Sequence, residues 1–113
     1  MPIKIEGILT DEMYKFLNEG INTREFYKEN NVKFVRVDEF SKDADIRIIS
    51  AEKLLERGTA EGILDGTILV ENSDIDDKLE IVPLGDNLLP TGKFHWLPEI
   101  FIELPDYVLR RLP

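Results

Sequence analysis

The apolar residues of this chain come in short segments bounded by charged clusters, and that spacing limits the fold more than any other feature. No segment approaches the roughly 18–20 apolar residues that a membrane-spanning helix needs. Thirteen isoleucines and a hydrophobic share of 42% still allow 113 residues to bury a core. The pattern therefore predicts one small domain over residues 1–113, built from short strands and helices.

Cysteine is absent, which excludes disulfides, thiolate metal sites and cysteine nucleophiles. The N-terminal residues alternate apolar and polar side chains and contain no apolar signal segment. Both features favour a cytoplasmic protein.

The first half of the chain, residues 1–57, predicts the order β-α-α-β-β-α. A strand is expected over residues 2–8, followed by a helix that Thr10 caps and Gly20 ends. Asn22, with a glutamate three residues later, forms a capping-box pattern that predicts a second short helix.

Two strands follow, at residues 32–38 and 44–49, because both segments are rich in β-branched residues. Ser50 is expected to cap a third helix. Gly58 is expected to end that helix in the left-handed conformation.

The second half predicts mainly strands. Asp65-Gly66 between two apolar runs is typical of a two-residue hairpin. Further strands are expected at 78–84, 93–97 and 99–104, before a short helix at 105–112 that opens with Pro105. The fold class that follows is α+β: a mixed or mainly antiparallel sheet, two or three short helices, and a mostly β second half.

The net charge of −9 is concentrated in one stretch. Residues 58–106 carry eleven acids and two bases, whereas the residues before them are nearly balanced. Such a field favours a basic protein surface as partner and opposes direct contact with nucleic acid or a membrane. The predicted partner-binding residues are the densest acidic cluster and one aromatic anchor: Glu71, Asp74, Asp76, Asp77, Glu80 and Trp96.

Catalytic chemistry has little support in the sequence. His95 is the single histidine, no serine lies in a nucleophile elbow, and the acidic cluster fits the calcium-loop pattern in neither register. No catalytic residue, metal ligand or cofactor is therefore predicted. A carboxylate nuclease using metal at Asp38 and Asp45, or at Asp76-Asp77-Lys78, is the weakest alternative.

Three classes of function remain. The first is a non-catalytic acidic binding protein, in one version an inhibitor of viral or mobile-element origin that imitates nucleic-acid charge. The second is a structural or assembly subunit that uses the C-terminal half, where Leu-Pro recurs four times, and this reading leaves homo-oligomerisation open. The third is the small metal-dependent hydrolase or nuclease.

Overall fold

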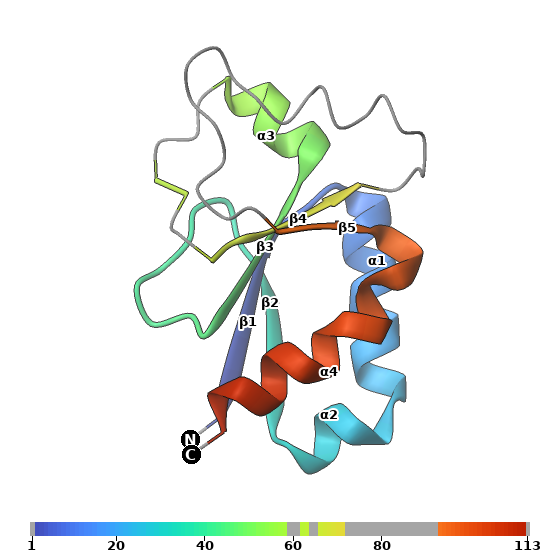
Figure 1. The fold of residues 1–113 in the computed structure, drawn as a ribbon. Coiled ribbons are helices and arrows are strands. Elements are labelled where there is room, and N and C mark those ends of the chain that lie inside the picture. The colour runs from blue at the N-terminus through green and yellow to red at the C-terminus, as the bar shows by residue number, and fades with distance from the viewer. Residues whose placement is uncertain (1, 59–61, 64–65, 72–92, 113) are drawn as a thin grey trace.

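The computed structural model describes residues 2–58, 62–63, 66–71 and 93–112. Their elements lie around one sheet (Figure 1). In chain order they are β1 (Ile3–Ile8), α1 (Asp11–Thr23), α2 (Glu25–Glu29), β2 (Val32–Arg36), β3 (Ile46–Ser50), α3 (Ala51–Arg57), β4 (Ile68–Glu71), β5 (Lys93–Trp96), a 3-10 turn (Leu97–Glu99) and α4 (Ile100–Arg111).

The sheet has five strands in the order β2-β1-β3-β4-β5, and every neighbouring pair is parallel. This is the strand order of flavodoxin-like α/β folds. The prediction of a mixed or mainly antiparallel sheet with a mostly β second half is therefore wrong. The arrangement is parallel α/β.

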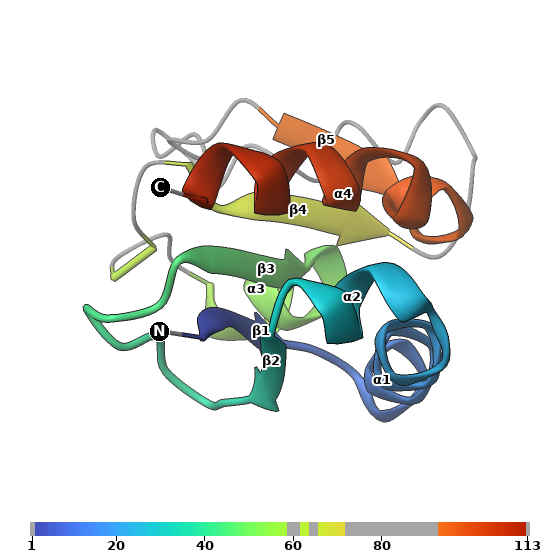
Figure 2. The same cartoon turned by 90° about the horizontal axis from the view of Figure 1, so that it is seen from below.

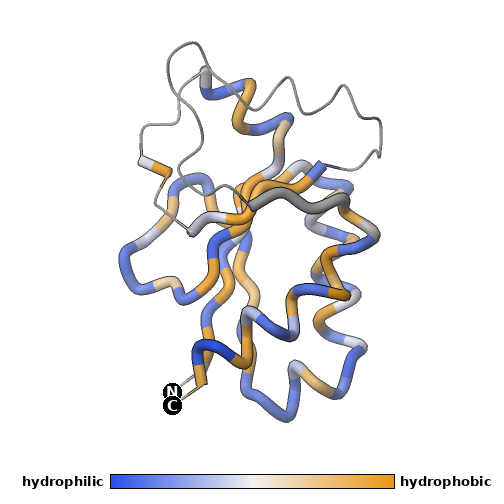
Figure 3. The backbone as a smooth tube through the Cα atoms, viewed as in Figure 1, coloured by the Kyte–Doolittle hydropathy of each residue, from blue (hydrophilic) through white to orange (hydrophobic). Residues whose placement is uncertain are grey.

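Helices cover both faces of the sheet (Figure 2). On one face, α1, α2 and α4 pack over inward residues of β1, β3 and β4 in a single core cluster. On the other face, Ala51 and Leu54 of α3 pack against Ile8, Ile49 and Leu69. The three central strands are thus largely buried on both sides, and orange apolar residues predominate along them in Figure 3. The face of β1 under the 37–45 connection also carries Lys4 and Glu6. Burial on both faces is typical of parallel strands.

The end of the chain differs most from the prediction. Residues 99–104, expected to be a strand, form the end of the 3-10 turn and the start of α4. Pro105 lies inside that helix rather than at its first position. The apolar residues Ile100, Leu104 and Val108 recur at helical spacing and are fully buried, so packing on the sheet decides in favour of the helix.

The hairpin expected at Asp65-Gly66, between residues 63–64 and 67–70, is wrong. Gly66 has a positive φ of 87°, but β4 pairs in parallel with β3 on one side and with β5 on the other, which leaves no edge for an antiparallel partner. Asp65 and the predicted strand at 78–84 lie outside the described residues.

Several local predictions are confirmed. Thr10 caps α1 by accepting a hydrogen bond from the backbone N–H of Met13, and Ser50 caps α3 in the same way. Gly58 ends α3 at φ 71°. The order β-α-α-β-β-α is also confirmed for residues 1–57.

Two helix boundaries are wrong. Gly20 does not end α1, which continues to Thr23. The glycine instead leaves room for the ring of Phe101 on α4. Asn22 caps nothing, since its side chain donates to Asn18 and Arg24 takes the N-cap position of α2.

The connection from β2 to β3 contains no helix. Residues 37–45 cross β1 on the face that α3 also covers, and Val37 and Phe40 pack into the apolar cluster there. Further along the connection, Ser41 and Asp43 bond to side chains of β1. The crossover is therefore held by a polar cluster as well as by apolar contacts.

Candidate functional site

The carboxyl ends of the strands form the edge at which open parallel sheets usually bind ligands. The chain runs from β1 to β2 on one side and then returns to β3 on the other, so the order reverses beside β1. A cavity of about 260 Å³ opens at this edge. It is lined by Ile8, Leu9, Arg36, Val37, Asp38, Lys53, Glu56 and Arg57.

The cations of this edge are paired with carboxylates. The pairs are Arg36–Asp11 at 2.8 Å, Arg57–Glu39 at 2.9 Å and Lys53–Glu56 at 3.4 Å. Arg36 also donates to the carbonyl of Leu9, and its guanidinium lowers the pKa of Asp11. These bases are thus already engaged within the chain.

The hydroxyls at the carboxyl edge are engaged too. Thr10 Oγ1 accepts from the N–H of Met13, and Ser50 Oγ accepts from the N–H groups of Glu52 and Lys53. Both hydroxyls therefore serve helix capping. Among the described residues, no group of three or more His, Cys, Asp or Glu side chains is placed to hold a metal ion.

A second polar cluster lies on β1 beneath the 37–45 crossover. Glu6 is 1% exposed and accepts hydrogen bonds from both the N–H and the hydroxyl of Ser41. Ser41 Oγ also lies 2.5 Å from Asp43, and Lys4 Nζ lies 3.1 Å from Glu6 and 3.4 Å from Asp43. A hydroxyl donates one proton, so the lysine supplies the remaining compensation for the two carboxylates.

The titration of Glu6 follows from this geometry. Burial acts to raise its pKa, but the hydrogen bonds from Ser41 and Lys4 outweigh burial, and the pKa of Glu6 is lowered. The hydroxyl of Ser41 and the ammonium of Lys4 likewise lower the pKa of Asp43. The cluster therefore holds two carboxylates in their charged form, which is a stabilising role.

Three of the five exposed large hydrophobic side chains among the described residues lie on α4 or at its C-cap. Ile102 is 72% exposed, Leu109 is 50% exposed and Leu112 is 37% exposed. With half-buried Pro105 between them, these positions follow a spacing of three, four and three residues, which places them on one stripe. We call Ile102, Pro105, Leu109 and Leu112 the outer stripe of α4.

The predicted partner-binding residues are only partly described. Glu71 ends β4 and is 1% exposed, so its side chain is not part of an exposed acidic surface. Trp96 ends β5, where its Cα pairs with that of Glu71. Asp74, Asp76, Asp77 and Glu80 lie outside the described residues, so their role stays a prediction.

The structure separates the two carboxylates of the nuclease alternative. Asp38 follows the carboxyl end of β2, whereas Asp45 precedes the amino end of β3. In a parallel sheet those are opposite edges. Asp45 instead accepts a hydrogen bond from the N–H of Lys4 at 2.9 Å.

Sequence reasoning missed the outer stripe. The strand predicted at residues 99–104 assigns Ile102 a period of two residues, which hides the helical spacing of the stripe.

Comparisons with known proteins add no assignment: no family model, curated protein or solved structure matches this chain. Within the described part of the chain, no helix combines the length and apolar character needed to cross a membrane.

Proposed function

We propose that this chain is a non-catalytic binding protein whose α4 docks onto an apolar strip, bordered by basic residues, on a partner protein. The observation that carries the proposal is the outer stripe of α4. Helix α4 already buries Ile100, Leu104 and Val108 against the sheet, yet it carries a second apolar side that faces solvent. Isolated exposed apolar residues are ordinary, but three on one stripe, with half-buried Pro105 between them, are typical of a docking surface.

The charges beside the stripe indicate the partner's chemistry. Exposed Glu99 and Asp106 and half-buried Glu103 lie along the first two turns of α4 or just before them, whereas the basic residues Arg110 and Arg111 are confined to its last turn. No ion pair among the described residues uses these three carboxylates. Basic residues bordering an apolar strip complement these carboxylates, whereas a second copy of a chain with a net charge of −9 is repelled.

Site-specific crosslinking tests the proposal. An apolar photo-crosslinking residue replaces Ile102 in one variant and Leu55, which is 43% exposed on α3 across the sheet, in the matched control. The variants are irradiated in lysate of the native host, and the crosslinked segment is sequenced. We expect the variant at position 102, but not the variant at position 55, to form a crosslink with a partner protein. The crosslinked segment of that partner should be apolar and flanked by lysine or arginine.

Titration of the purified partner then quantifies the contact. Ile102→Asp is expected to weaken binding at least about tenfold, and Leu55→Asp to leave it unchanged. Added salt should also weaken binding. The proposal fails if position 102 crosslinks to a second copy of the chain or to an acidic segment, or if Ile102→Asp leaves the affinity intact.

The finer prediction, imitation of nucleic-acid charge by an inhibitor, depends on the acids of residues 71–80. It is separate from the α4 surface. A cytoplasmic location likewise stays a prediction.

A further inference from the structure

A second cavity lies at the opposite edge of the sheet. About 310 Å³ in volume, it opens where the last turns of α4 cross the amino ends of β3 and β4. Its lining consists of Asp45, Ile46, Arg47, Gly66, Ile68, Tyr107, Arg110 and Arg111. Volumes near 300 Å³ are at the small end of the range for ligand pockets.

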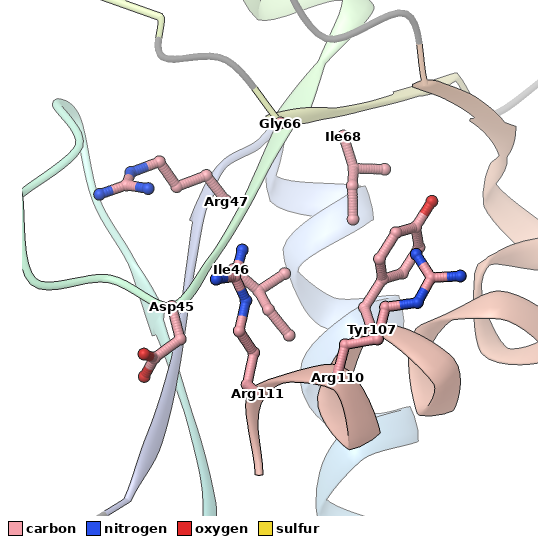
Figure 4. Close-up of a pocket in the computed structure, with 8 residues that line it drawn as sticks. All are labelled: Asp45, Ile46, Arg47, Gly66, Ile68, Tyr107, Arg110 and Arg111. Atoms are coloured by element: carbon pink, nitrogen blue, oxygen red, sulfur yellow. The ribbon is translucent and has the colours of Figure 1, made fainter. Parts of the chain in front are cut away.

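Apolar and cationic groups meet in this cavity. Ile46 and Ile68, which are 4% and 1% exposed, belong to the sheet face that α4 covers. Figure 4 shows Arg111 extending beside Ile46 and Arg110 beside Tyr107. The guanidinium carbon of Arg110 lies 5.6 Å from the centre of the Tyr107 ring.

The two other charged residues of the lining are engaged elsewhere. Arg47 points away from Arg110 and Arg111 in Figure 4 and donates to the carbonyl of Ser41 at 2.7 Å. The carboxylate of Asp45 accepts from the backbone of β1. Arg47 is itself a cation, and no ion pair of the described residues joins Asp45 to Arg110 or Arg111.

Arg110 and Arg111 differ from the cations at the carboxyl edge. At that edge Arg36, Lys53 and Arg57 each form an ion pair, as does Lys4 on β1, but within the described part of the chain neither arginine of α4 has a carboxylate partner. Other described cations, such as Lys28 and Lys33, also form no ion pair, so what requires an explanation is that two such charges lie together at one cavity.

The simplest explanation is the helix dipole, since cations in the last turn of a helix are stabilised by its negative end. That effect accounts for the presence of basic residues. It does not account for a cavity with an apolar floor between two guanidinium groups.

We propose that the cavity binds a small organic anion, a phosphate monoester or a carboxylate. Its charged group lies at the guanidinium groups of Arg110 and Arg111, and its apolar body rests on Ile46 and Ile68 beside the ring of Tyr107. Guanidinium groups recognise both anions through charge-assisted hydrogen bonds. This site is independent of the α4 docking surface, because Tyr107, Arg110 and Arg111 are not residues of the outer stripe.

Calorimetric titration of the full chain tests the site with three probes: phenyl phosphate, benzoate and inorganic phosphate. If the apolar floor contributes, at least one of the two organic anions binds more tightly than inorganic phosphate. Comparison of phenyl phosphate with benzoate distinguishes the phosphate from the carboxylate. Arg110→Gln and Arg111→Gln should each weaken binding about tenfold. Lys28→Gln, which removes an exposed charge from α2, is the matched control and should change nothing.

A mutation-free measurement locates the probe. In amide NMR spectra of the unmodified chain, the tighter organic anion should shift the signals of Ile46 and Tyr107 more than those of residues in α2. The proposal is overturned if neither organic anion binds at millimolar concentration, or if the shifts lie elsewhere. It is also overturned if Lys28→Gln weakens binding as much as the arginine variants, because the attraction is then only general charge. Ile102→Asp should leave anion binding intact, which separates this test from that of the docking surface.

Discussion

Gly20 shows how one residue can permit a tertiary contact. A Cβ at this position would lie well inside van der Waals distance of Cζ of Phe101. The ring has little freedom to move, because it packs between Phe16 and Tyr27, with the guanidinium of Arg24 4.1 Å from its centre. The glycine therefore sets how closely α1 and α4 approach.

Gly20→Ala is therefore expected to destabilise the protein by about 1–3 kcal/mol, even though alanine favours the helix by about 1 kcal/mol. Chemical denaturation measures the change. In a Phe101→Leu background the penalty should shrink, because the clashing ring is gone. If Gly20→Ala stabilises the wild-type chain, the close approach of the two helices is refuted.

At the scale of elements, α4 contains Pro105, a residue that destabilises the interior of a helix. Pro105 has no N–H to donate to the carbonyl of Phe101, and its ring presses on that carbonyl. The helix persists because Ile100, Leu104 and Val108 are fully buried by it. The free energy gained by packing these side chains against the sheet is thus larger than the free-energy cost of a proline inside the helix.

Pro105→Ala should consequently raise the free energy of unfolding by about 1–3 kcal/mol, because the missing hydrogen bond is restored and the steric contact is relieved. Thermal or chemical denaturation provides the measurement. Asp106→Ala, in the same turn and exposed, is the matched control and should stay within about 0.5 kcal/mol. A loss of stability in Pro105→Ala would contradict this account of α4.

At the scale of the whole molecule, the described acids are largely offset by bases. Among the residues that the structure describes, five ion pairs connect the elements or stabilise them internally, and the Glu6 cluster ties the 37–45 crossover to β1. The stability of the fold is therefore coupled to the ionisation of a few carboxylates.

Acid should weaken the fold. The pKa values of Glu6, Asp11 and Asp43 are lowered in the folded state, so their charged forms stabilise it above their unfolded pKa values near 4. That contribution is lost as the pH falls from about 5 through the lowered pKa values. Denaturation from pH 7 to pH 3 should show the decline.

Glu6→Gln isolates the buried member of this group. It should cost about 1–3 kcal/mol at pH 7, since a charge-assisted hydrogen-bond network is lost, and it should flatten the decline in acid. Glu29→Gln, at an exposed position on α2, controls for the loss of one negative charge. A profile as steep in Glu6→Gln as in the wild type would exclude a role for this cluster.

The sequence by itself was sufficient to predict the helix caps at Thr10 and Ser50, the end of α3 at Gly58 and the element order of residues 1–57. These features depend on residues within about four positions of one another, so their signals are local. The apolar composition and short segments likewise indicated a domain built from short elements.

Only the tertiary structure decided the rest. Parallel pairing joins Ile3 to Val32 and Ile5 to Ile46, and nothing local records such contacts. The same holds for the burial of Glu71, for the outward position of Ile102, and for the placement of Arg110 and Arg111 over β3 and β4. The physical reason is that strand order and helix docking minimise the exposed apolar area of the whole chain, and each segment's own pattern is compatible with several such arrangements.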